Sequence, residues 1–254
     1  MLLLSEGLAF IKPYAKGDTA HSLSYYESDL PVNNEPFECG TLDEKLIGDT
    51  DLEDAFRAGD CQMRTYRLAV AVTGEYATTV LGASSAGNAA DDATVAAHVV
   101  TSINQINEWY ERDLAARFIL IANLADIFYY DGATDPYTND EATTMLGENV
   151  DNLDMVIGDT NFDIGHVLGR SGGGSSGVAR LNALCGASKA RGVTRASAGG
   201  INQPRFLKVW SHEMGHQLSL PHPFLGWEGG VSHDGSIQHD FNDPAPETVL
   251  YNYT

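Results

Sequence analysis

The sequence is poor in basic residues and has no long apolar run, and each shortage excludes a class of partner. Its 254 residues include 15 lysines and arginines against 35 aspartates and glutamates, which gives a net charge of −20. Nucleic acids and anionic membrane surfaces would be repelled by this charge, so neither is expected as a partner. No apolar run approaches the ~20 residues of a membrane-spanning helix, so membrane insertion is not expected either.

Cysteine is also scarce. The chain has only Cys39, Cys61 and Cys185, too few for a disulfide scaffold, and an odd number in a secreted protein implies a free thiol or a missing partner. The opening Met-Leu-Leu-Leu lacks a basic leader and a small-residue cleavage site, so it does not resemble a signal peptide. We therefore expect the natural start to lie upstream.

The chain divides into a leader and one larger domain. Residues 31–60 are acidic, contain Pro31 and Pro36, and have few large apolar side chains, which is typical of a linker. From residue 61 onward the sequence has the apolar content of a folded domain, and 254 residues suit one large domain with an appendage. We therefore expect a leader and acidic linker at 1–60 and a main domain at 61–254.

The main domain alternates predicted strands and helices. β-Branched, aromatic and apolar residues predict strands at 64–73, 116–122, 127–130 and 162–168. A second helix is predicted to begin near Asn139-Asp-Glu-Ala, at residues 139–142. Alternation of this kind predicts an α/β (or α+β) fold with helices packed on a mixed sheet.

The first long helix is predicted from a single apolar stripe. Steps of four and three residues place five side chains on one face of a helix: Val95, Val99, Ile103, Ile106 and Tyr110. Asp91 or Asp92 is the expected cap at its start.

A third helix, predicted at 203–218, carries the residues with the clearest chemistry. His212 and His216 are four residues apart and therefore lie on one helical face, where both imidazoles can bind one metal ion. Pro221 ends the helix, and His222 follows as a third ligand. Three histidines leave one coordination position open, the arrangement of a catalytic zinc site. One zinc ion is therefore predicted, with His233 or His239 as alternative third ligands.

Glu213 lies between the first two histidines and is the predicted general base. Zinc lowers the pKa of its bound water toward ~7, and a neighbouring carboxylate can take the proton and pass it to a leaving amine. The competing interpretation is a surface helix with incidental histidines. It does not explain why Glu213 lies between His212 and His216, or why His222 directly follows Pro221.

Two other features are given structural interpretations. The glycine-serine run at 172–177 matches a nucleophile-elbow pattern and a dinucleotide pattern, but no helix follows it, so we interpret it as a flexible loop. His166 lies in a strand-like run and is expected to be a packed or hydrogen-bonded core residue.

Together these segments resemble the metzincins. His212-Glu-Met-Gly-His216 through His222 resembles their extended zinc motif, and the segments 64–76, 133–138, 161–168 and 188–194 are similar to the reprolysin or adamalysin branch, especially its bacterial secreted members. The resemblance implies a secreted zinc metalloendopeptidase that acts on proteins or peptides. It also implies a mixed, mostly parallel twisted sheet over long helices, with the active-site helix along a cleft and an edge strand near Gly177, Val178 and Ala179 that pairs with the substrate.

The family resemblance also suggests a role for the leader at residues 1–60. In related proenzymes a cysteine thiolate of the prodomain binds the zinc where water should bind, so residues 1–60 are interpreted as a prodomain remnant with Cys39 as a latency switch. A disulfide between Cys39 and Cys61, or an unpaired thiol, is the alternative. Cys185 resembles a family cysteine whose partner lies beyond the zinc helix.

Two departures from the family pattern bear on activity. The family has glycine three residues after the second histidine, in a left-handed turn, and here that residue is Ser219, at a cost of about 1 kcal/mol. No methionine follows Met214, although metzincins have a methionine-containing turn beneath the zinc, so we expect the chain to stop short of that turn.

The departures leave open a catalytically silent adhesion or binding module. A zinc hydrolase acting on a non-protein amide is a further alternative. Calcium is compatible with so acidic a chain, but no residue pattern assigns a calcium site or an oligomeric interface.

Overall fold

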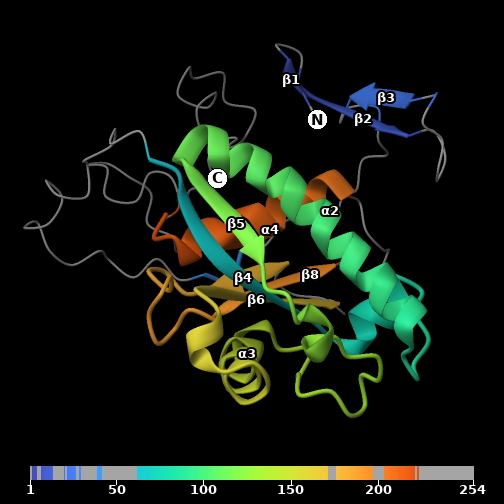
Figure 1. Cartoon of the computed structure of the whole chain (residues 1–254), viewed down its shortest axis with the longest axis vertical. Helices are drawn as coiled ribbons and strands as arrows, with labels where there is room; N and C mark the ends of the chain where they lie inside the picture. The colour runs from blue at the N-terminus through green and yellow to red at the C-terminus, as the bar shows by residue number, and fades with distance from the viewer. Residues whose placement is uncertain are drawn as a thin grey trace, which may run out of the picture.

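The fold was analysed in a computed structural model, which describes residues 2–4, 7–13, 20, 22–26, 29, 39–41, 62–170, 176–196, 203–220 and 222. Near the N-terminus, β1 (Leu2–Leu4), β2 (Gly7–Pro13) and β3 (Ser22–Tyr26) form an antiparallel three-stranded sheet. The main domain contains a five-stranded sheet with helices on both faces (Figure 1).

The five-stranded sheet is mostly parallel, as predicted. Its strands are β4 (Arg64–Val72), β5 (Ala116–Leu120), β6 (Ile164–Arg170), β7 (Gly177–Ala179) and β8 (Gly192–Ala196). They lie in the order β5-β4-β6-β8-β7, and only β7 runs antiparallel to its neighbour. The central strands β4 and β6 are parallel; residues 68–72 of β4 form a buried apolar run, and all of β6 but its last residue is buried.

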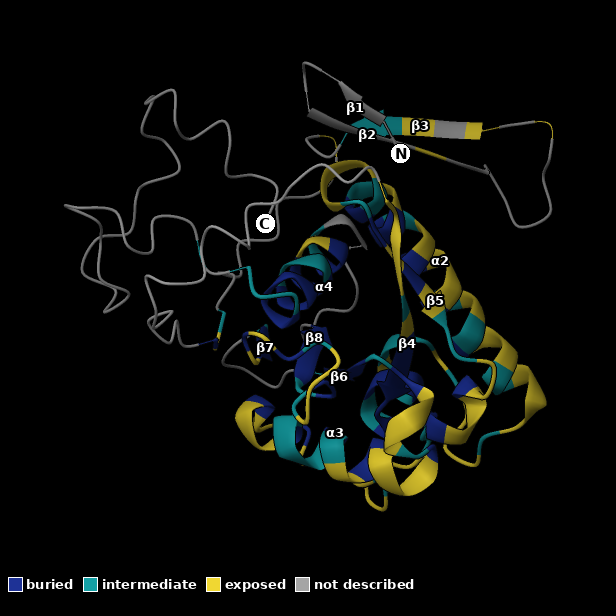
Figure 2. Ribbon diagram, turned by 60° about the vertical axis from the view of Figure 1, so that its left-hand side comes forward, coloured by how far each residue is buried: buried dark blue, intermediate teal, exposed yellow. Residues whose placement is uncertain are grey.

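The helices cover opposite faces of this sheet. Successive residues of β6 point to opposite faces of the sheet. On one face, His166 packs against Trp210 of α4 (Gln203–Gln217). On the other face, a Cβ added to Gly165 would meet Leu153 of α3 (Ala142–Val156) at 2.5 Å, so glycine allows α3 to approach closely. α2 (Ala89–Leu114) lies on the same face as α4 (Figures 1 and 2).

The predicted stripe of α2 is confirmed. Its apolar members are all buried, with at most 4% of any side chain exposed: Val95, Val99, Ile103, Ile106 and Tyr110. The Tyr110 hydroxyl donates to the Ser211 carbonyl at 2.6 Å and so ties α2 to α4. The cap prediction was wrong, because Asn88 caps the helix by accepting from the backbone N–H groups of Ala90 and Asp91.

Of two further predictions, the strand at 127–130 was wrong and the start of the second helix is confirmed. Residues 127–130 are not a strand: Leu124–Ile127 forms a 3-10 turn, and only Phe128 bridges to Val72. The run is apolar because Ile127 and Phe128 are buried, not because it belongs to the sheet. α3 begins at Ala142, within the predicted start segment 139–142, and the Asn139 side chain before it is bonded to the backbone N–H and carbonyl of Arg170.

The core lies between the sheet and the two helical layers. Buried side chains (dark blue in Figure 2) line the inner faces of α2, α3 and α4, and exposed ones lie on the outer faces of α2 and α3. Among the helices that the structure describes, none is both long and apolar enough to cross a bilayer.

Candidate metal centre and active site

α4 places its apolar face on the sheet and its histidines at the edge strand. Leu207, Trp210 and Met214 are fully buried at steps of three and four. Glu213 and His216 face β7, where Glu213 packs on Gly177. The helix therefore holds Glu213 against the edge of the sheet while it buries the neighbouring apolar stripe.

α4 ends in a left-handed turn at the position where the family has glycine. Ser219 has a φ of +73°, its N–H donates to the His216 carbonyl, and the Leu220 N–H donates to the Gly215 carbonyl. These two bonds form a Schellman motif, which satisfies carbonyls at the end of the helix. The Ser219 hydroxyl also lies 3.1 Å from the Asn182 side-chain oxygen. Ser219 thus adopts the expected turn despite its side chain, and the chain reverses toward His222.

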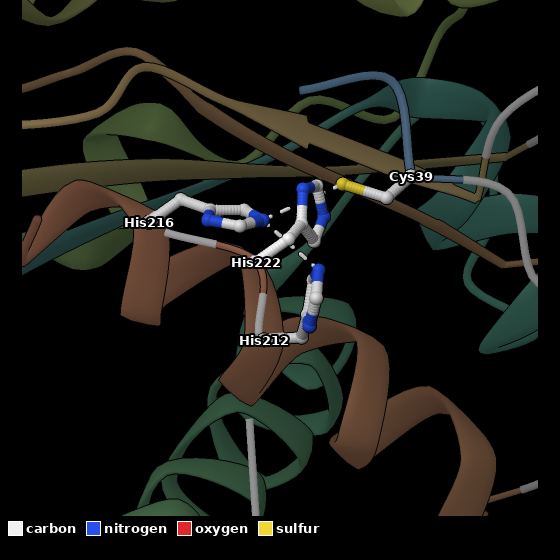
Figure 3. Close-up of side chains that lie close together, drawn as sticks. All are labelled: Cys39, His212, His216 and His222. Atoms are coloured by element: carbon white, nitrogen blue, oxygen red, sulfur yellow. Dashed lines mark hydrogen bonds between the residues drawn. The ribbon is translucent and has the colours of Figure 1, made fainter. Parts of the chain in front are cut away.

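Four side chains converge beyond this turn (Figure 3). Single donor atoms of Cys39, His212, His216 and His222 all lie within 4.8 Å of one another. The His216 and His212 Nε2 atoms are 2.9 Å apart, and the Cys39 sulfur is 3.5 Å from His216 Nε2. The structure therefore brings all three predicted metal ligands and the predicted switch cysteine to one point.

The donor set suits zinc. Imidazole nitrogen and thiolate sulfur are its preferred ligands, and donors at ~2.0–2.3 Å from a tetrahedral ion lie about 3.3–3.8 Å apart. The distances of 2.9 and 3.5 Å are close to that spacing. His216 Nδ1 lies 2.7 Å from the Leu220 carbonyl, so Nδ1 carries the proton and the Nε2 lone pair faces the cluster.

Glu213 is completely buried beside this cluster. Burial raises its pKa to about 8, with smaller opposing effects of hydrogen bonds from Cys39 and Thr41. Among the described residues, Oε1 of Glu213 has no hydrogen-bond partner. Burial, together with the nearby Glu213 carboxylate, also raises the pKa of the Cys39 thiol, and a bound cation would reverse that direction.

Gly177 fixes the position of Glu213. A Cβ added to Gly177 would lie 2.5 Å from Glu213 Oε1 and 2.6 Å from its Cγ, closer than real contacts allow. The family resemblance implies only a substrate-binding role for Gly177. The absence of a side chain there also lets the carboxylate pack directly against the edge strand.

In the Cys39→Ser background, we expect Gly177→Ala to lower kcat by about 10- to 100-fold with unchanged zinc content, because a displaced base loses proton transfer and leaves the histidines in place. The matched control is Gly147→Ala in α3, where an added Cβ meets nothing within 4 Å. Steady-state kinetics and metal analysis of both variants test this expectation. Wild-type kcat in Gly177→Ala would contradict it.

The predicted edge strand is β7, and its outer edge is occupied. Val178 pairs with Val193 of β8, so the backbone groups of Gly177 and Ala179 face outward. They contact residues 39–41 of the leader: Cys39 forms a parallel bridge with Gly177, and the Gly40 N–H donates to the Gly177 carbonyl at 2.8 Å. Cys39 is a free thiol, while Cys61 lies outside the described residues.

A buried network that the motif did not predict anchors the end of α4. The Gln217 amide nitrogen donates to the carbonyls of Gly165 and Lys189, so its oxygen must accept from Nδ1 of His166 at 3.0 Å. His166 Nε2 then accepts from the Thr194 hydroxyl at 2.9 Å. Burial lowers the pKa of His166 to about 4, which keeps the ring neutral. The expectation of a hydrogen-bonded core histidine is confirmed, whereas Gln217 carried no signal beyond its place next to His216.

Other predicted residues lie outside the described part of the chain. They include His233 and His239, the alternative third ligands, and most of the glycine-serine run. Cys185 is an exposed free thiol in a left-handed conformation.

Comparison with known families points to one group. Residues 96–223, just over half of the chain, match the model of the reprolysin-like metallopeptidase family M12B. The match begins within α2 and ends directly after His222. Comparison with curated proteins gives no significant match.

Proposed function

Because the chain belongs to the reprolysin-like M12B family of metallopeptidases, we propose that it is a zinc-dependent endopeptidase acting on extended protein or peptide substrates. The observation that carries the proposal is the convergence of His212, His216 and His222 beside the buried Glu213. Family membership supports peptide-bond hydrolysis, and the donor set supports zinc.

Each part of the site has a defined task in this mechanism. His212, His216 and His222 would hold the ion, which, when bound, polarises the scissile carbonyl and lowers the pKa of a water molecule. Glu213 takes a proton at a carboxylate oxygen and passes it to the leaving amine nitrogen. Its burial strengthens this role, because a desolvated carboxylate is a stronger base than one in water.

The edge strand would orient the substrate. The outward N–H and carbonyl of Ala179 and the carbonyl of Gly177 are the groups with which an extended peptide backbone pairs. An extended substrate paired there passes alongside Glu213, because Gly177 and Glu213 are in contact. By resemblance to bacterial secreted relatives, we further propose that the protein acts outside the cell.

Cleavage of a quenched-peptide library by the Cys39→Ser chain tests the function. We expect hydrolysis that a chelator abolishes and added zinc restores. A chain that binds zinc stoichiometrically but cleaves neither the library nor casein would refute the endopeptidase proposal, leaving a binding module. Cleavage that persists in chelator would refute the metal dependence.

Cys39 is proposed to keep the enzyme latent, with residues 1–60 as the prodomain remnant. A sulfur at the position that water needs would leave Glu213 no proton to accept, and Cys39 Sγ lies within the donor cluster. We expect Cys39→Ser to cleave peptides at least about tenfold faster than the wild type. The two proteins must be compared at equal zinc occupancy, since the thiol also adds a ligand. Equal cleavage rates for the wild type and Cys39→Ser would contradict the switch. Cys185→Ser is the control for loss of a thiol elsewhere in the chain.

A further inference from the structure

The segment Cys39–Thr41 contacts the active site through more than its cysteine. Thr41 is 2% exposed. It contacts Ala179 of β7 and Glu213 of α4, which are 138 and 172 residues away in the sequence. Its N–H lies 3.4 Å from the Cys39 sulfur, so the two residues form one compact turn. The side chains of Cys39 and Thr41 then meet different parts of the site.

The Thr41 hydroxyl lies at the backbone groups of Ala179 with which an added strand would pair. The Ala179 N–H donates to Thr41 Oγ1 at 2.8 Å, and Oγ1 lies 3.1 Å from the Ala179 carbonyl. The Thr41 hydroxyl therefore engages the Ala179 N–H and lies within hydrogen-bonding distance of the Ala179 carbonyl, the two groups that an added strand would use at this residue. No metal takes part in these contacts.

The same hydroxyl also reaches the general base. Thr41 Oγ1 lies 3.3 Å from Glu213 Oε2, and its single proton serves either that carboxylate or the Ala179 carbonyl. Glu213 Oε1 has no partner among the described residues, so Thr41 provides one of the few polar contacts of this buried carboxylate.

We propose that Thr41 is a second, metal-independent anchor that holds Cys39–Thr41 on the outer edge of β7 and blocks both substrate pairing at Ala179 and the base Glu213. The blocking role rests on the proposed peptidase function, whereas the anchoring role does not. Removal of the cysteine or of the metal would therefore leave the Thr41 contacts on β7, so the site would open only in part of the molecules. Full opening requires loss of the Thr41 contacts as well.

Hydrogen exchange in the metal-free full-length chain tests the anchor without any catalysis. The reporter is the Gly40 amide, which donates to the Gly177 carbonyl. Loss of buried hydrogen bonds worth about 1.5–3 kcal/mol corresponds to an increase in exchange of about 10- to 100-fold. We expect this increase in Thr41→Val, which keeps the shape and loses the hydroxyl. Thr41→Ser and Cys39→Ser are expected to retain the wild-type protection.

Two outcomes of this experiment would overturn the anchor. One is unchanged Gly40 exchange in Thr41→Val, and the other is a loss of protection in metal-free Cys39→Ser as large as in Thr41→Val. Protection of the Val70 amide in the central strand β4 confirms in each variant that the main domain is folded.

Peptide cleavage by the zinc-loaded proteins tests the blocking role. Cys39→Ser/Thr41→Val is expected to be about tenfold more active than Cys39→Ser, and Cys39→Ser/Thr41→Ser is expected to match the single variant. Equal activity of the double valine variant and Cys39→Ser would overturn blocking. If every zinc-loaded variant is inactive, the peptidase proposal fails and blocking fails with it, whereas the exchange result still decides the anchor.

Discussion

Glu213→Gln is expected to lower peptide hydrolysis by about two to four orders of magnitude while zinc remains bound. Glutamine has nearly the shape of glutamate but no basic carboxylate, so it cannot accept the proton that the reaction releases. The fall should appear in kcat, because the base acts in the chemical step and contributes little to ground-state binding. Quenched-peptide kinetics in the Cys39→Ser background, with parallel metal analysis, measures both quantities.

Glu108→Gln on the exposed face of α2 is the matched control, since it makes the same chemical change away from the site. We expect wild-type kinetics from it. If Glu213→Gln retains more than about a tenth of the activity, Glu213 is not the general base, and the buried carboxylate beside β7 needs another explanation.

His222→Ala is expected to weaken zinc binding by at least about 100-fold, because two helical histidines alone leave half of a tetrahedral site unfilled. Cys39 contributes a fourth donor to the cluster, so the comparison is made in the Cys39→Ser background, where sulfur cannot compensate. Competition with a chromophoric chelator gives the dissociation constants.

Unweakened, stoichiometric zinc in this variant would remove His222 from the ligand set and point to His233 or His239. Variants of those two histidines are therefore the comparison series, and wild-type affinity is expected of both. A loss of affinity in either one that equals the loss in His222→Ala would also contradict the assignment.

The sequence by itself determined the local geometry of the site. Helical periodicity places His212 and His216 on one face, and the four-and-three spacing of apolar residues predicted the buried stripe of α2. Pro221 predicted the end of the zinc helix, and the family pattern identified Ser219 as the residue in the left-handed turn. Features of this kind depend on residues within one or two helical turns, so the sequence is enough to infer them.

Apolar runs in the sequence predicted which segments are buried, but not always whether a buried segment is a strand. The strand prediction is confirmed for β4 and β6, where residues 68–72 and 164–169 are buried. It failed at 127–130, where an equally apolar run packs into the core through a 3-10 turn and one bridge to Val72. Burial selects apolar side chains in either case, and only the available hydrogen-bonding neighbour decides whether a strand forms.

The tertiary structure alone decided the contacts between distant segments. It packs Glu213 on Gly177, joins Gln217 to His166, and places the hydroxyl of Thr41 on Ala179, 138 residues away. Such contacts depend on strand order and on the closeness of two backbones, which no local pattern encodes. The histidine motif could therefore be predicted from the sequence, whereas the occupied edge strand and the buried network at the end of α4 follow from how the sheet brings β7, β8 and α4 together.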